Sequence, residues 1–261
     1  MSELAPLDIT GDHHVHTHFC NHATGEMEEY VLAAIEKGLR SLIFLEHLEG
    51  GLSYAPRIWL TSEDFQEYFA QGERLQEQYG EQLTIQLGAE VGYNPGAVDN
   101  LLAQLAAFPF AHCGLSCHFY FDGTEHLNML SRRTDHIKKM AELGIEPILD
   151  AYFTNLIQGC QDIPCDKLCH LDAALRHNAP VLTAHHHSLI EELFTVMQEK
   201  GIALEVNTSG YELRPYPYPA FTFIEKAQQL GIPLIMGSDA HRPEQVGRFF
   251  TRAAEELSQR G

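Results

Sequence analysis

Hydrophobic positions along the chain alternate between two patterns. Short apolar runs typical of buried strands are separated by longer stretches in which apolar residues recur with the period of a helix. The apolar runs lie at residues 12–17, 41–47, 84–91, 113–119, 166–172, 203–209 and 233–241. Strands that alternate with helices form a parallel sheet covered by helices, so we predict an α/β fold closed into a barrel. An open doubly wound sheet is the alternative, but no G-x-G-x-x-G motif follows the first strand.

Capping signals locate several of the helices. Ser188 and Glu191 form a capping box, and Gly201 suits the end of the helix that they begin. Pro147 suits the first turn of another helix. We predict helices over residues 26–38, 136–144 and 188–201, and a further one that begins near Pro147.

Length and composition favour one domain. The chain has 261 residues, of which 44% are hydrophobic, and nothing in its middle resembles a linker or a repeat, so we expect a single domain over residues 1–261. We find no secretory signal and no apolar run near the roughly 18 residues needed to span a membrane, so we expect a cytoplasmic protein without a membrane partner. The six cysteines are then expected to be reduced and mostly buried, because they lack C-x-x-C spacing.

Charge narrows the range of partners. The formal net charge is −19, and such an acidic chain repels phosphate backbones, which argues against nucleic acid. Sixteen histidines are unusually many, and histidine is the commonest metal-ligating side chain. The composition therefore points to metal chemistry, whereas the oligomeric state stays open.

Polar side chains gather at the ends of the predicted strands. In barrels of alternating strands and helices the active site lies at the carboxyl ends of the strands. Residues two apart on a strand face the same way, so His14 and His16 should converge, as should Asp239 and His241. The strand-end residues are His14, His16, Glu46, His47, Glu90, His118, His170, Asp239 and His241.

Imidazole and carboxylate ligands together suit zinc, iron or manganese. A lone buried histidine is more often hydrogen-bonded than metal-bound, so the argument rests on convergence from independent strands. Nine ligands are too many for one ion, which predicts two or three divalent ions. Such a cluster can lower the pKa of a bound water to about 7, which gives a hydroxide nucleophile at neutral pH. We expect Asp239 to bridge or orient that water.

These residues resemble the PHP (polymerase and histidinol phosphatase) superfamily. The similar motifs are D-x-H-x-H-T (12–17), E-H (46–47), G-x-E (88–90), S-x-H (116–118) and S-D-A-H (238–241). The histidinol-phosphate phosphatase branch is most similar, through LGAEVGYNPG (87–96), AYFTNLI (151–157), CDKLCHLDAALR (165–176), LEVNTSG (204–210) and SDAHRPEQVG (238–247).

The resemblance implies a distorted seven-stranded barrel with a metal site, usually of three ions. It implies as ligands His14, His16, His22, His47, Glu90, His118, His170, Asp239 and His241. Among these, Asp239, His241 and Glu90 are the expected catalytic residues. The implied activity is hydrolysis of L-histidinol phosphate to L-histidinol and phosphate. Another small phosphomonoester or a nucleotide is the alternative substrate, and a non-catalytic metal-binding module is a third possibility.

Several assignments stay open at this stage. Arg176 and Arg214 are candidates for binding the phosphate, because arginine offers a planar fork of donors. His18 would lie on the same strand face as His14 and His16 if the strand continued. We assign it to a position around the metal ligands or facing the substrate. If His170 is not a ligand, His185 replaces it. We place residues 185–187 in a loop before the Ser188 cap, His13 on the opposite face of its strand, and residues 51–69 at the rim, where Arg57 or Trp59 could contact substrate.

Overall fold

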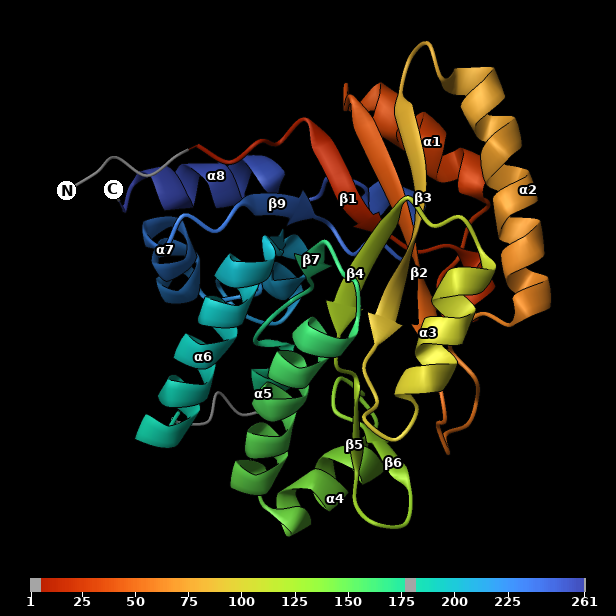
Figure 1. The fold of residues 1–261 in the computed structure, drawn as a ribbon. Coiled ribbons are helices and arrows are strands. Elements are labelled where there is room, and N and C mark those ends of the chain that lie inside the picture. Colours follow the sequence, from red (N-terminus) through yellow and green to blue (C-terminus); the bar gives the residue numbers. More distant parts are fainter. Residues whose placement is uncertain (1–5, 177–181, 261) are drawn as a thin grey trace.

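The computed structural model describes residues 6–176 and 182–260. Seven parallel strands form one sheet in the order β1-β2-β3-β4-β7-β8-β9. Their bounds are β1 (Gly11–Val15), β2 (Ser41–Glu49), β3 (Thr84–Gly92), β4 (His112–Ser116), β7 (Lys167–Leu168), β8 (Ala203–Asn207) and β9 (Leu234–Gly237). The two edges meet where the His16 amide donates to the Ala240 carbonyl at 2.8 Å, and Val15 forms a parallel bridge with Ala240. The sheet is thus a nearly closed, distorted barrel, as predicted (Figure 1).

Helices surround the barrel in the described part of the chain. They are α1 (Met27–Glu36), α2 (Ser62–Tyr79), α3 (Val98–Ala107), α4 (Thr134–Leu143), α5 (Ile145–Asp162), α6 (Ala184–Lys200), α7 (Phe221–Gln229) and α8 (Phe250–Ser258). The expected helices over 26–38 and 136–144 are present, and Pro147 lies in the first turn of α5. None of the helices in residues 6–176 and 182–260 is long and apolar enough to cross a bilayer.

The start of α6 differs from the prediction. The helix begins at Ala184, and Thr183 is its N-cap: the Thr183 hydroxyl accepts from the His186 amide at 3.3 Å. The ring of His186 closes the capping box by accepting from the Thr183 amide at 3.1 Å. The capping box predicted at Ser188 was therefore wrong, and residues 185–187 form the first helical turn rather than a loop.

Two segments beyond the strand ends also differ from expectation. The predicted strand 113–119 stops at Ser116, and a separate antiparallel hairpin of β5 (Phe119–Phe121) and β6 (His126–Asn128) follows. Figure 1 shows this hairpin and α4 below the ends of β2 and β4. Only residues 51–61 of the predicted rim are loop, because Thr61 caps α2 by accepting from the Asp64 amide.

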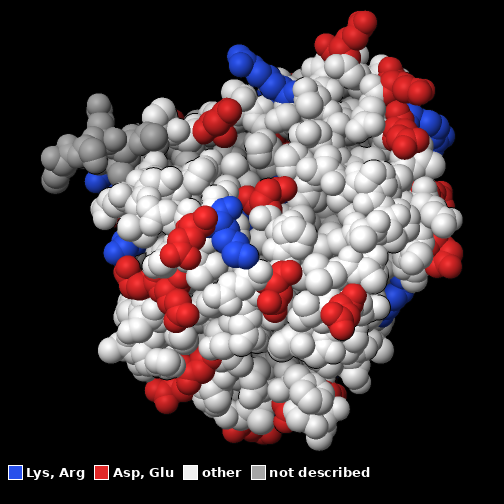
Figure 2. Space-filling model, viewed as in Figure 1, with Lys and Arg blue, Asp and Glu red and all other residues white. Residues whose placement is uncertain are grey.

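The core lies between the sheet and the inner faces of the helices. Strand β2 is buried from Leu42 to Glu49, which is typical of a parallel strand covered on both sides. Helix α2 packs closely on β3 because Gly72 has no side chain: a Cβ there would overlap the Leu87 side chain. On the outer face drawn in Figure 2, acidic side chains are scattered widely and outnumber the basic ones.

Candidate metal centre and active site

The carboxylate of Glu90 is the centre of a cluster at the carboxyl ends of the strands. Its Oε2 atom lies 2.9 Å from Nδ1 of His47, and its Oε1 atom lies 3.1 Å from Nε2 of His118 and 2.7 Å from Nε2 of His170. His47 lies within β2, while His118 and His170 follow β4 and β7, yet the three rings meet at one carboxylate. His170, not His185, therefore belongs to the cluster, whereas His185 is 63% exposed and lies beside Asp150.

The first strand and the last strand supply a second group. Nε2 of His14 lies 2.9 Å from Nε2 of His16, which in turn lies 3.4 Å from Oδ1 of Asp239. Both imidazole nitrogens are 3.6 Å from Oε2 of Glu90. The expected convergence of His14 with His16 is thus present, and Glu90 joins this group to the first one.

His22 and His241 form a third group at the more exposed side of the cluster. Nδ1 of His22 lies 2.9 Å from the Cys20 carbonyl oxygen, and Nδ1 of His241 lies 3.0 Å from the Asp239 carbonyl oxygen. Because a carbonyl only accepts, both Nδ1 atoms carry the hydrogen and both Nε2 atoms present a lone pair. Those two Nε2 atoms face each other at 2.9 Å.

Opposed lone pairs at this distance repel each other unless a proton or a metal cation lies between them. Burial lowers the pKa of both His22 and His241, the latter to about 3, which disfavours the proton. The donor set, imidazole nitrogens with carboxylate oxygens, is the one that zinc, iron and manganese accept. The residues therefore fit divalent metal ions. All nine predicted ligands lie in the cluster, namely His14, His16, His22, His47, Glu90, His118, His170, Asp239 and His241.

The two carboxylates of the cluster are held in the ionised form. Burial by itself would raise the pKa of Glu90, but His118 and His14 hold it well below its ordinary value. The pKa of Asp239 is likewise well below its ordinary value, because the hydrogen bond from His16 and the charge of His14 outweigh burial. Ionised carboxylates are the form that binds cations.

The imidazoles fall into two classes. Burial and the neighbouring His16 hold the pKa of His47 well below its ordinary value, so this ring is neutral. Burial would lower the pKa of His14 as well, but Glu205 and Glu90 raise it well above its ordinary value. For His118, Glu90 and Glu49 outweigh burial and raise the pKa to about 10. Metal binding at His14 and His118 would therefore release protons.

Two buried carboxylates lie behind the cluster, and the sequence analysis missed both. Oε1 of Glu49 is 2.7 Å from Nδ1 of His118, and Oε1 of Glu205 is 2.6 Å from Nδ1 of His14. A signal existed for Glu49, which is two residues after His47 on the same strand and hence on the same face. Glu46, by contrast, accepts from the amide and hydroxyl of Thr17.

Two cysteines lie close to the cluster. The thiol of Cys20 is within reach of His22 and His241, and that of Cys169 is within reach of His14 and Glu90. Burial raises the pKa of both thiols. A raised pKa favours the thiol over the thiolate, which is the form that binds metals. All six cysteines are unpaired, as expected.

Backbone conformation marks two of the candidate ligands. His170 has φ 27° and Asp239 has φ 50°, values that non-glycine residues rarely adopt. Such strain is common at functional sites, where the surrounding structure holds it in place. It also explains why both residues lie just past the ends of β7 and β9 rather than inside the longer strands that we predicted.

The cluster opens into a cavity of about 510 Å³. Arg176 lines it and donates to the Leu130 carbonyl at 2.8 Å. Arg248, which the sequence analysis missed, donates to the carbonyls of Ser238 at 2.9 Å and Asp239 at 3.0 Å. Arg132 and Arg242 also line the cavity.

Three residues that were predicted to bind substrate or to be able to contact it lie elsewhere. Arg214 forms an ion pair with buried Asp172 at 2.5 Å, and its guanidinium lies over the ring of Tyr218. Its charge is therefore neutralised by a partner within the fold. The ring of His18 lies 3.3 Å from the Gly25 carbonyl and is outside the cavity lining. Arg57 pairs with Asp64 at 2.8 Å. The structure therefore gives these three residues local partners instead of a place in the cavity.

The remaining histidines have ordinary partners. His13 lies on the far face of β1, 3.4 Å from the Ser41 hydroxyl, as expected. His112 lies 3.2 Å from Asp166, and His126 accepts from the Ser53 amide at 3.1 Å. His136 packs edge-on against Tyr54, and His177 is outside the described residues.

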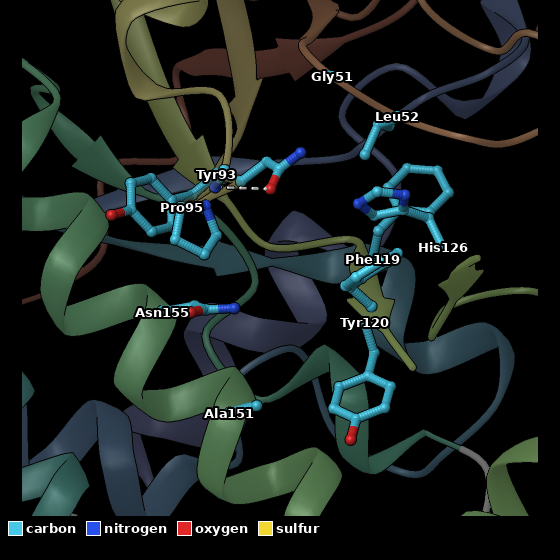
Figure 3. Close-up of a pocket in the computed structure, with 12 residues that line it drawn as sticks. Gly51, Leu52, Tyr93, Pro95, Phe119, Tyr120, His126, Ala151 and Asn155 are labelled. Atoms are coloured by element: carbon cyan, nitrogen blue, oxygen red, sulfur yellow. Dashed lines mark hydrogen bonds between the residues drawn. The ribbon is translucent and has the colours of Figure 1, made fainter. Parts of the chain in front are cut away.

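A second cavity, of about 360 Å³, is lined in part by residues of the β5–β6 hairpin. Figure 3 shows its walls, which include Tyr93, Phe119, Tyr120 and Asn155. Its described lining contains no carboxylate and one histidine, His126. Its described lining therefore lacks the set of imidazoles and carboxylates that the first cavity has.

Known proteins resemble this chain along most of its length. The PHP domain model matches residues 12–209, and the PHP-associated model matches residues 224–259. A Deinococcus radiodurans protein named "Probable histidinol-phosphatase" is 30% identical over 258 residues, covering 94% of this chain and 92% of its own.

Two solved structures share the fold. One, from Listeria monocytogenes, has a TM-score of 0.83 at 21% identity and covers 93% of this chain and 99% of its own. The other is a histidinol phosphate phosphatase from Lactococcus lactis complexed with zinc, L-histidinol and phosphate. It has a TM-score of 0.73 at 21% identity and covers 96% of this chain and 93% of its own. The matched family model spans more than half of the chain, and this protein therefore belongs to the PHP domain family.

Proposed function

We propose that this protein is a metal-dependent phosphomonoesterase that hydrolyses L-histidinol phosphate to L-histidinol and phosphate. One observation carries the proposal: a single cavity combines a buried histidine–carboxylate cluster with the arginines Arg132, Arg176, Arg242 and Arg248. Such a site suits a small phosphorylated substrate. The name of the Deinococcus relative and the ligands of the Lactococcus protein favour histidinol phosphate among such substrates.

Two or three divalent ions would be held by the nine residues of the cluster, with zinc, iron and manganese as the candidates. When bound, such ions neutralise phosphate charge and lower the pKa of a water molecule. The residues fall into groups that could each hold an ion, among them His14 with His16 and Asp239, and His47 with Glu90 and His118.

The side chains of the chain itself orient the reacting groups. Asp239 is ionised, and the Ser209 hydroxyl donates to its Oδ2 atom at 3.2 Å, which fixes the carboxylate in place. Glu90 is ionised between the imidazoles, and His241 presents its Nε2 lone pair toward the cluster. We assign Asp239, Glu90 and His241 to the catalytic machinery. Arg176 offers guanidinium donors to the phosphate, and Tyr54 and Ile58 give the organic part of the substrate an apolar wall.

We further propose that residues 1–261 act as one domain in the cytoplasm. Strand β9 lies within the PHP-associated match, yet it pairs with β8 of the PHP domain match and completes the same barrel. The unpaired cysteines suit a reducing compartment. The net charge of −19 favours a small substrate over nucleic acid.

The test is phosphate release from L-histidinol phosphate by protein reconstituted with zinc, iron or manganese, beside a panel of other phosphomonoesters and short nucleotides. We expect selective release from histidinol phosphate and near-complete loss of it in Asp239→Asn. Selective phosphate release from another ester would show that this ester, and not histidinol phosphate, is the substrate. Silence across the panel with all three metals would favour a metal-binding module without turnover.

Two arginines provide a matched pair of variants. Arg176→Ala should lower kcat/KM about 10- to 100-fold, the effect of losing a charged hydrogen bond worth about 1.5–3 kcal/mol. Arg214→Ala should instead lower the melting temperature, because it leaves buried Asp172 without its partner. Measured well below the melting temperature, its kcat/KM should stay within about threefold of the wild-type value, and a larger loss would return Arg214 to the substrate site.

A further inference from the structure

We propose that Glu49 and Glu205 are positioning residues that hold His118 and His14 with their Nε2 atoms directed at the metal cluster. Neither carboxylate is among the nine candidate ligands. The inference rests on the proposed metal-dependent function and adds to it the groups that set the tautomer and the orientation of two ligands.

The contact between Glu49 and His118 admits one tautomer. The side chain of Glu49 at the end of β2 is buried, and its Oε1 atom is 2.7 Å from Nδ1 of His118. The Glu49 carboxylate accepts from Nδ1, so once the ring gives up its second proton to bind a cation, Nδ1 keeps its hydrogen and Nε2 offers the lone pair. That Nε2 atom is the one that lies 3.1 Å from Glu90.

Glu205 holds two candidate ligands at once. Its Oε1 atom is 2.6 Å from Nδ1 of His14, whose Nε2 atom then faces His16. Its Oε2 atom accepts from the backbone amide of His170 at 2.9 Å and from the Asn207 side chain at 3.1 Å. The bond to the amide supports His170 in its positive-φ conformation.

The ion pairs described for these two carboxylates involve histidine alone. A buried carboxylate is costly unless hydrogen bonds and opposite charge compensate it. The described side-chain hydrogen bonds of Glu49 and Glu205 lead to His118, to His14 and His170, and to Asn207. Their interactions are therefore directed mainly at the metal cluster.

Each carboxylate occupies space that a glycine on the neighbouring strand leaves open. Gly92 lies opposite Glu49 in the register of β2 and β3, and a Cβ there would overlap the Glu49 carboxylate. A Cβ on Gly237 of β9 would overlap Oε1 of Glu205. Two independent positions thus show the same construction, a glycine that makes room for the carboxylate behind a ligand histidine.

The first experiment measures zinc affinity by competition with a chromophoric chelator, together with the number of zinc ions per chain. Glu49→Gln and Glu205→Gln should each weaken zinc binding about 10- to 100-fold, the usual effect of losing such a partner. Glutamine keeps the shape, but its amide can donate and so no longer selects one tautomer. Glu49→Asp and Glu205→Asp, which keep the charge but withdraw it from the ring, should also weaken zinc binding and serve if a glutamine variant does not fold.

A double-mutant cycle separates positioning from a general structural role. If Glu49 acts through His118, then Glu49→Gln should have no further effect on zinc affinity in a His118→Asn background. In a His14→Asn background, Glu205→Gln should likewise have little further effect on zinc affinity. Any remaining loss of affinity would come from the hydrogen bond between Glu205 and the His170 amide. Additive losses in the Glu49 cycle would overturn the proposal for that residue.

The glycines provide a matched set. Gly92→Ala and Gly237→Ala should displace the carboxylates and weaken zinc binding as the glutamine variants do. Gly72→Ala, which overlaps only the Leu87 side chain, should lower the melting temperature and leave zinc affinity unchanged. Equal zinc affinity in wild type and both glutamine variants would overturn the positioning role alone. A wild-type protein that binds no zinc, iron or manganese would overturn the proposed function and this inference together.

Discussion

Two histidine-rich segments of the chain look alike in sequence but differ in structure. Residues 11–25 contain five histidines, and three of them, His14, His16 and His22, reach the metal cluster. Residues 185–187 are three consecutive histidines, and none of them lines the cavity of the cluster. The density of histidine therefore does not identify a metal site.

Position in the fold explains the difference. The first segment consists of β1 and the residues just after it, and the carboxyl end of β1 lies beside those of the other strands, so its side chains meet ligands from elsewhere in the chain. The second segment is the first turn of α6, in the outer layer. There His186 is buried and caps the helix beside Asp150, while His185 and His187 are exposed. Histidines form a candidate metal site only where other strands bring further ligand side chains beside them.

The largest expected effect separates the two segments by activity. His16→Asn should lower kcat/KM on the phosphomonoester substrate by about a thousandfold or more, because losing a ligand forfeits several kcal/mol of charge stabilisation. His186→Asn, assayed at the same temperature well below its melting point, should retain activity within about threefold. Steady-state kinetics with the same metal supply measures kcat/KM for both variants. Comparable losses of kcat/KM in both would show that the two histidine segments do not differ in function.

A smaller effect concerns stability. His186→Ala should lower the free energy of unfolding by about 1–2 kcal/mol, because it removes the closing group of the capping box at α6. His185→Ala should change it by less than about 0.5 kcal/mol, since that ring is exposed. Urea titrations of metal-free protein measure both values. If His185 mattered as much as His186, the capping role assigned to His186 would be wrong.

The smallest effect lies inside the first segment, at His13. Burial and the nearby charge of Lys167 lower the pKa of His13 to about 4 in the folded protein, against 6.5 for an ordinary histidine. Above pH 6.5 the ring is neutral in both states, and as the pH falls toward 4 the unfolded chain takes up the proton first, so stability is lost. His13→Gln should therefore remove about 1 kcal/mol of the stability loss between pH 7.5 and pH 5.5.

Metal-free wild type and variant, titrated with urea at both pH values, give that difference. Only the change in the free energy of unfolding between the two pH values is compared, so any pH-independent loss of stability caused by the substitution cancels. An unchanged pH dependence in His13→Gln would mean that this ring ionises freely in the folded protein.

Much of the site could be predicted because its residues lie at the ends of recognisable strands. The barrel follows from apolar runs that alternate with helices, and the convergence of His14 with His16 follows from strand parity. Asp239 and His241 also lie close together, but past the end of β9, where strand parity does not apply. The predicted ends were less accurate: β4 stops at Ser116, and α6 begins four residues before Ser188. Such ends depend on local hydrogen bonds, here that of Thr183, which the hydrophobic pattern does not contain.

The sequence alone determined the class of fold and the types of side chain that reach its catalytic end, because hydrophobic period and residue chemistry are local properties. Only the tertiary structure placed His170 and not His185 beside Glu90, paired Arg214 with Asp172 away from the cavity, and placed Arg248 in the cavity lining. It also placed Glu49 and Glu205 behind their histidines. These contacts of His170, Arg214, Glu49 and Glu205 join residues at least 42 positions apart, and the distance between such residues is set by packing.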